Sequence, residues 1–140
     1  MLPEKRKASA KPWFQFANGD LRAALVLSSM PNGVYPQIAY HCQQTAEKSM
    51  KGFLIYHGVR FQKTHNLVEL LGLIVSVDSV MAKKLEEPAQ FLNPFAVSYW
   101  YPDAEVEELS ESQIQKAVAL AKLSFEFITS AIPFDAQWDL

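Results

Sequence analysis

The sequence contains one cysteine, Cys42, and no apolar run of the roughly 18 residues that a membrane-crossing helix needs. A single cysteine has no partner for an internal disulfide, so a reducing cytoplasm is the expected compartment. The first residues, MLPEKRKASAK, carry charges and precede no apolar segment of the kind found in signal peptides. We therefore expect a cytoplasmic protein that does not enter a membrane.

Several signatures of catalytic and cofactor sites are also missing. No group of cysteines and histidines has metal-ligand spacing, and no glycine-rich phosphate loop or activated serine arrangement is present. The sequence therefore predicts no metal site and no cofactor.

Strand patterns are nearly absent and there is no internal repeat, whereas helical spacing of apolar residues is common. A first helix is predicted from Pro12, which suits a first helical turn, to about Met30, before a turn at residues 31–33. Residues 1–11 are predicted to be a flexible basic tail. The apolar face of this helix is predicted to consist of Trp13, Phe16, Ala17, Leu21, Ala24 and Leu27.

A second helix is predicted to begin at Tyr35 or Pro36 and to end where Gly58 adopts a left-handed conformation. One of its faces is an apolar stripe of Ile38, Cys42, Ala46, Met50, Phe53 and Leu54. Another face is polar and consists of Tyr40, Gln44, Lys48 and Lys51. Glu47 stands four residues before Lys51, in the order that favours a helical ion pair.

Two shorter helices are predicted next. Thr64 is a candidate N-cap for a helix from His65 to about Val77, and Ser79 for a helix through Leu85 that Pro88 stops or kinks. Residues 91–102 read as an irregular packed segment, and residues 103–108 as an exposed acidic loop.

The last helix has the clearest pattern. Ser110 and Gln113 have the spacing of a capping box, apolar residues then recur at helical spacing, and Pro133 marks the end. The sequence thus predicts an all-α fold, an antiparallel bundle of four to five helices over residues 12–132. Residues 133–140 are expected to be a C-terminal tail, and Trp138 is expected to dock on the body or on another subunit.

Charge is unevenly distributed along the chain. Residues 1–70 hold 9 lysines and arginines against 4 acidic residues, whereas residues 71–140 hold 4 against 11. The acidic second half argues against nonspecific duplex binding by the whole domain, but a local phosphate site in the first half is possible. Its candidate residues are Gln44, Lys48, Lys51 and Lys63. The alternative is that these lysines form a solvated basic face.

Five segments together resemble the HEPN family of helical nucleotide-binding domains. They are Asp20-Leu21 with Ala24, the stretch YHCQQTAEKSMKGFL at residues 40–54, Gly58 followed by KTHNL at residues 63–67, Tyr101-Pro102-Asp103, and the long final helix. The resemblance covers most of residues 13–130. Relatives often carry an arginine where this chain has Trp100, so any phosphate contact made by that arginine is missing here.

The resemblance implies a HEPN-like bundle of four to five helices that forms a homodimer and occurs alone or beside a small nucleotidyltransferase partner. Some branches of the family bind nucleotides without cleaving anything. Others are metal-independent ribonucleases of toxin-antitoxin systems, which use an arginine and a histidine spaced by four to six residues.

Arg60 and His65 fit that spacing, with four residues between them. A histidine can move a proton near neutral pH, and an arginine can hold a phosphate through two parallel hydrogen bonds. The alternative for His65 is structural: it hydrogen-bonds the second helix at Gln44 or Glu47.

Two functions follow. One is a noncatalytic dimer that binds a nucleotide, RNA or a nucleotidyltransferase, with Tyr99, Trp100 and Tyr101 lining a groove. The other is a ribonuclease that uses Arg60 and His65.

Overall fold

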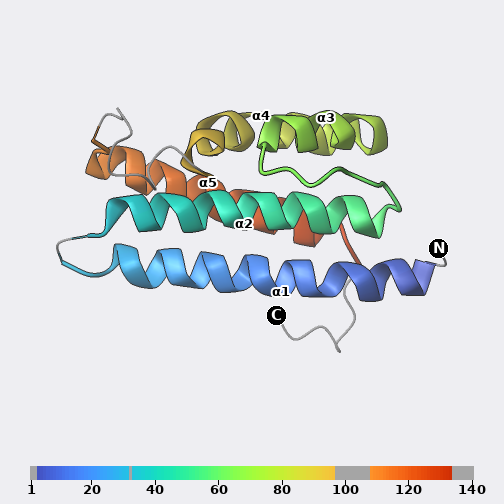
Figure 1. The fold of residues 1–140 in the computed structure, drawn as a ribbon, viewed down its shortest axis with the longest axis horizontal. Helices are drawn as coiled ribbons and strands as arrows, with labels where there is room; N and C mark the ends of the chain where they lie inside the picture. The colour runs from blue at the N-terminus through green and yellow to red at the C-terminus, as the bar shows by residue number, and fades with distance from the viewer. Residues whose placement is uncertain (1–2, 32, 97–107, 134–140) are drawn as a thin grey trace.

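The computed structural model describes residues 3–31, 33–96 and 108–133. Within these ranges the chain forms five α-helices and one short 3-10 helix, and no strand. The predicted all-helical bundle is therefore confirmed. In Figure 1, α1 and α2 run antiparallel, α5 lies behind α2, and α3 and α4 lie on the side of α2 away from α1. None of the described helices combines the length and the apolar character of a membrane span.

The elements follow one another in the order α1, α2, α3, α4, η1 and α5. Their bounds are Pro3–Ser28 for α1, Tyr35–Tyr56 for α2, Leu67–Val77 for α3, Ser79–Leu92 for α4, Asn93–Ala96 for η1 and Glu111–Ser130 for α5.

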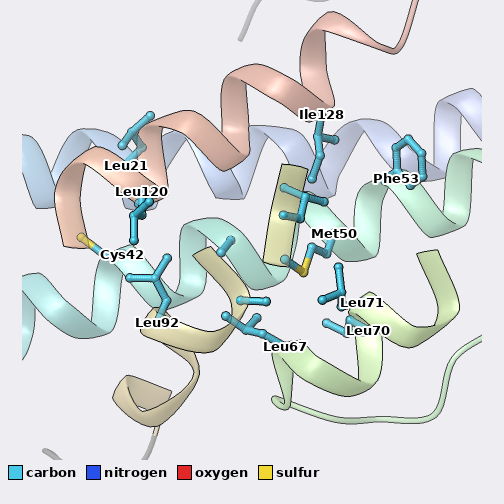
Figure 2. Close-up of a cluster of buried hydrophobic side chains, with 14 of the residues drawn as sticks. Leu21, Cys42, Met50, Phe53, Leu67, Leu70, Leu71, Leu92, Leu120 and Ile128 are labelled. Carbon is cyan, nitrogen blue, oxygen red and sulfur yellow. The ribbon is translucent and has the colours of Figure 1, made fainter. Parts of the chain in front are cut away.

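The central element is α2, which contacts α1, α3, α4, α5 and η1. Every residue of its predicted apolar stripe is completely buried: Ile38, Cys42, Ala46, Met50, Phe53 and Leu54. Figure 2 shows part of this core, where Cys42, Met50 and Phe53 of α2 lie among leucines from α1, α3, α4 and α5. Because four helices bury their apolar faces against one helix, α2 fixes the positions of the others.

The first helix begins nine residues earlier than predicted. It starts at Pro3 and continues through Pro12, so residues 3–11, which the sequence predicts as part of a tail, are helical. Pro12 removes one backbone hydrogen bond, but the residues before it are good helix formers. Ala10 is completely buried, so tertiary packing holds the first turns in place.

The buried face of α1 also differs from the prediction. Phe16 is 67% exposed, whereas Phe14 is completely buried. The inward residues of α1 are Ala10, Phe14, Ala17, Leu21 and Ala24. Phe14 packs directly against α2 at Gly52, where an added methyl group would lie 2.8 Å from Cζ of the Phe14 ring. Glycine is therefore required at this close approach.

Gly19 interrupts α1 without serving a packing role. A methyl group added there would meet no atom within 4 Å. We expect Gly19→Ala to raise the free energy of unfolding by about 1 kcal/mol, because alanine restricts the unfolded chain and favours helix. Urea unfolding followed by circular dichroism measures this, and Gly52→Ala, which meets the Phe14 ring, is the opposite control. An unchanged midpoint for Gly19→Ala would contradict the prediction.

The two helix starts after α2 differ from the prediction by one or two residues. Asn66, not Thr64, caps α3, and its side-chain oxygen accepts from the backbone N–H groups of Val68 and Glu69. The first N–H of α3, at Leu67, donates to Asn93 Oδ1 at 2.8 Å. This tertiary bond is invisible in the local sequence.

Asp78, not Ser79, caps α4 by accepting from the N–H of Met81. The helix continues past Leu85 and through Pro88 to Leu92. Leu85, Ala89 and Leu92 are completely buried, and this packing outweighs the hydrogen bond that Pro88 cannot make.

The last helix is confirmed, together with its capping box. Ser110 Oγ accepts from the N–H of Gln113 at 3.1 Å, and Gln113 Oε1 accepts from the N–H of Ser110 at 2.8 Å. Tyr99, Trp100 and Tyr101, most of the predicted acidic loop and the residues after Pro133 lie outside the described residues.

Candidate functional site

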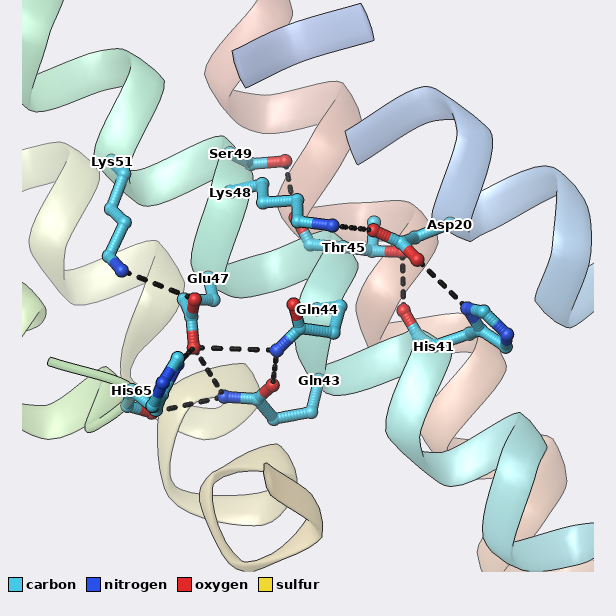
Figure 3. Close-up of polar contacts among 10 residues, drawn as sticks. All are labelled: Asp20, His41, Gln43, Gln44, Thr45, Glu47, Lys48, Ser49, Lys51 and His65. Carbon is cyan, nitrogen blue, oxygen red and sulfur yellow. Dashed lines mark hydrogen bonds and ion pairs between the residues drawn. The ribbon is translucent and has the colours of Figure 1, made fainter. Parts of the chain in front are cut away.

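Glu47 is the centre of a polar cluster on α2 (Figure 3). Its side chain is 4% exposed, and its two carboxylate oxygens have different partners. Oε2 accepts from Lys51 Nζ at 3.2 Å, and Oε1 lies 3.0 Å from His65 Nδ1. The amide nitrogens of Gln43 and Gln44 lie 3.2 and 3.5 Å from Oε1. Glu47 is therefore a buried carboxylate held by four donors.

Lys51 completes the buried part of this cluster. Its side chain is only 6% exposed. Besides Glu47, its ammonium group lies 5.6 Å from the centre of the Trp13 ring and 5.7 Å from that of Phe61. The two rings meet edge to face. Lys51 is thus enclosed by a carboxylate and two aromatic faces, which stabilise its positive charge.

His65 lies at the edge of the same cluster, just before α3. Its side chain is 62% exposed, and its Nδ1 contacts Glu47, so the predicted hydrogen bond to α2 is confirmed. Gln43 also donates to the backbone oxygen of His65 at 3.0 Å. When Nδ1 donates to this carboxylate, a neutral His65 ring keeps an acceptor at Nε2. Glu47 and Gln43 therefore fix both the backbone and the ring of His65.

A second polar cluster joins α1 to α2 (Figure 3). Oδ2 of Asp20, on α1, lies 2.6 Å from Lys48 Nζ. Its Oδ1 lies 2.8 Å from His41 Nδ1. Lys48 also lies 5.7 Å from the centre of the exposed Phe16 ring. The sequence placed Lys48 beside Lys51 on one face, but the structure pairs the two lysines with carboxylates of different clusters.

Two exposed cations lie on the connection between α2 and α3, residues 57–66. Arg60 and Lys63 are both exposed there, and no described ion pair or hydrogen bond joins Arg60 to His65. Arg60 and Phe61 line two hollows. One, of about 530 Å³, also involves Arg6, Ile55, Gly58 and Val59. The other, of about 280 Å³, also involves Gln62, Thr64, Glu69 and Leu73.

The structure thus divides the predicted site residues into three groups. Gln44, Lys51 and His65 meet at Glu47, Lys48 belongs with Asp20, and Arg60 and Lys63 stay exposed. The contact of His41 with Asp20 was not predicted, because no local pattern relates these two helices. Within the described part of the chain, no group of three histidine, cysteine or acidic residues could hold a metal ion.

Cys42 is a buried thiol outside these clusters. Burial raises its pKa from 9.0 to about 12. Between these values the unfolded chain loses the thiol proton while the folded chain keeps it, so Cys42 lowers stability as pH rises above 9. We expect no reaction of the folded protein with a thiol reagent at about pH 8 and full reaction in denaturant. Rapid labelling of the folded protein would contradict this expectation.

The chain is similar to a known protein family and to a solved structure. The model of the family described as HEPN domain matches residues 10–131. Among solved structures, the fold is similar to the crystal structure of TT1696 from Thermus thermophilus, with a TM-score of 0.71 and 23% sequence identity. That match covers 88% of this chain and 98% of the other, and it shows the fold alone. A comparison with curated proteins found no significant match. Because the family model covers most of its length, this chain belongs to the HEPN domain family.

Proposed function

We propose that this HEPN domain is a noncatalytic module that binds phosphate groups of a nucleotide or of RNA at the connection between α2 and α3. The observation that carries the proposal is the contrast between its cations. Lys48 and Lys51 on α2 are paired with carboxylates, whereas Arg60 and Lys63 on the connection are exposed. The exposed pair can approach a phosphate without breaking a buried contact.

The buried pair on α2 is unsuited to this task. Moving Lys51 toward a phosphate would leave Glu47, which is 4% exposed, without its principal counter-charge. An unpaired buried charge costs several kcal/mol, about as much as a phosphate contact can return. We therefore propose that Gln44 and Lys51, predicted as direct ligands, support the connection that binds instead.

Binding is tested with two probes, ATP in calorimetry and a short fluorescent single-stranded RNA in anisotropy. Arg60→Ala combined with Lys63→Ala should weaken binding at least tenfold and reduce the dependence on salt, because each lost cation removes about 0.7 from the single-strand salt slope. Lys83→Ala, an exposed lysine on α4, is the matched control. Wild-type protein that binds neither probe would contradict the proposal, and binding of only one probe identifies the ligand class.

Membership in the HEPN family supports two further parts of the proposal, a homodimer and a nucleotidyltransferase partner. Light scattering of the purified chain tests the dimer, and co-purification with a small nucleotidyltransferase tests the partner. Tyr99 and Tyr101 remain proposed to line the binding groove. Their replacement by alanine should weaken RNA binding without changing the folded state.

A ribonuclease is the second candidate, and the contact between Glu47 and His65 favours it. A carboxylate at Nδ1 keeps Nε2 free to accept a proton, as a general base requires. In such a reaction, Nε2 would take the proton of an RNA 2′-hydroxyl, whose oxygen would attack the adjacent phosphorus. The bond to the 5′-oxygen would break, that oxygen would take up a proton, and Arg60 would stabilise the charged phosphate.

Structured RNA incubated with the protein and a chelator distinguishes the two functions. Cleavage by the wild type that disappears in both Arg60→Ala and His65→Ala would overturn the noncatalytic proposal. Intact RNA, bound by the wild type, would support it.

A further inference from the structure

The larger of the two hollows lies where the start of α1 meets the end of α2. Figure 1 shows these two ends side by side. The residues lining this hollow include two arginines and no acid: Arg6, Ile55, Gly58, Val59, Arg60 and Phe61. Two guanidinium groups from segments far apart in the sequence thus face one space. Like charges brought together this way favour an anion between them.

Arg6 is held in an unusual position. Its Nε atom is buried and has no hydrogen-bond partner among the described residues. A buried N–H donor that lacks an acceptor is costly, and natural folds leave few of them. Because this atom is closed off from solvent, an external anion would meet the terminal nitrogens of the same guanidinium, whose side chain lines the hollow.

Gly58 makes this position possible. It has a φ of +73°, which glycine adopts readily, and it ends α2 as predicted. A methyl group added at Gly58 would lie 2.8 Å from Arg6 Nη1 and 3.2 Å from Arg6 Cδ. The guanidinium of Arg6 therefore rests on backbone that only glycine leaves uncovered. One residue both turns the chain and forms the surface under Arg6.

The charge around the two hollows favours the one beside Arg6. The smaller hollow includes Glu69, whose carboxylate accepts from the hydroxyl of Thr64 at 2.9 Å and would repel a phosphate. The described residues that line the larger hollow include no acidic side chain. Arg60 lines both hollows. An anion beside Arg60 is therefore attracted to the hollow that also holds Arg6 and is repelled from the one that holds Glu69.

We propose that Arg6 and Arg60 together hold one phosphate group in this hollow, as the anchoring contact of the bound nucleotide or RNA. The inference rests on the proposed function for the identity of the ligand, and it adds α1 to the binding surface. Phe61, which lines the same hollow, offers an aromatic face to the ribose or base that follows the phosphate.

The first measurement uses ATP and the fluorescent RNA with Arg6 variants. Arg6→Ala should weaken binding of the bound probe about tenfold, and Arg6→Lys should restore only part of it, because lysine keeps the charge and loses the paired donors. Lys5→Ala, one position away and exposed, should change binding less than about twofold. Thermal unfolding of each variant shows whether α1 remains folded. Unchanged affinity in a folded Arg6→Ala protein would overturn the inference.

The second measurement observes Arg6 directly. Titration with inorganic pyrophosphate should shift the Nε–H signal of Arg6 in a nitrogen–proton NMR spectrum, with Arg6→Lys identifying that signal by its absence. A shift with pyrophosphate but no binding of ATP or RNA would keep the anion site and overturn the proposed function. The opposite result would be probe binding that depends on Arg60 and Lys63, with no shift of the Arg6 signal and no effect of Arg6→Ala. It would support the proposed function and overturn the anion site at Arg6.

Discussion

Replacing Glu47 with alanine should lower the free energy of unfolding by about 3–5 kcal/mol, because it leaves the charge of Lys51 buried without a partner. Lys51 is 6% exposed, so water cannot take the place of the carboxylate. Gln43, Gln44 and His65 lose the same acceptor. Urea unfolding at neutral pH, followed by circular dichroism, measures this loss.

Two controls distinguish the stability lost because the pair is buried from the stability that any ion pair contributes. Glu87→Ala breaks the pair with Lys116, in which both side chains are about half exposed or more, and should cost less than about 1 kcal/mol. Glu47→Leu combined with Lys51→Met should recover much of the stability, because apolar residues of similar size often replace a buried pair without loss. If Glu47→Ala costs no more than Glu87→Ala, the cluster is not a buried electrostatic unit.

Replacing Phe14 with alanine should cost a comparable amount, about 3–5 kcal/mol. Phe14 is completely buried and fills the space against Gly52, where α1 and α2 approach closely. Its loss would leave a cavity between the two longest helices. Thermal and urea unfolding of the variant measure the cost.

Phe16→Ala is the matched control, two residues away on the same helix. Phe16 is 67% exposed, and its described contact is with the ammonium group of Lys48, so we expect a loss below about 1 kcal/mol. A larger cost for Phe16 than for Phe14 would mean that the opposite side of α1 packs on α2.

The Glu47 prediction also bears on function, because Glu47 contacts both Lys51 and His65. A variant at Glu47 would change stability and the orientation of His65 together. The double variant, Glu47→Leu with Lys51→Met, recovers the stability but not the orientation of His65. If His65 acts as a base on RNA, this double variant should be folded and inactive, whereas RNA binding through Arg60 should persist.

The sequence alone determined the elements whose signals are local. The apolar stripe of α2 repeats at helical spacing, and all of its predicted residues are buried. The capping box of Ser110 and Gln113 satisfies two backbone donors within one helical turn, so it could be read without knowledge of any neighbour. The left-handed Gly58 and the pair of Glu47 with Lys51 are local in the same way. These features were sufficient to predict the bundle, whereas the family was inferred from the resemblance of whole segments, such as YHCQQTAEKSMKGFL at residues 40–54, to HEPN domains.

Only the tertiary structure decided which of two equally plausible local choices the chain adopts. Pro12 could start α1 or lie within it, and the burial of Ala10 selects the longer helix. Phe14 or Phe16 could face inward, and the packing of Phe14 against α2 at Gly52 selects Phe14. Lys48 and Lys51 looked alike in sequence, yet Asp20 pairs with one and Glu47 with the other. The physical reason is that the free energy of a buried side chain depends on what surrounds it, and those surroundings come from residues distant in the chain.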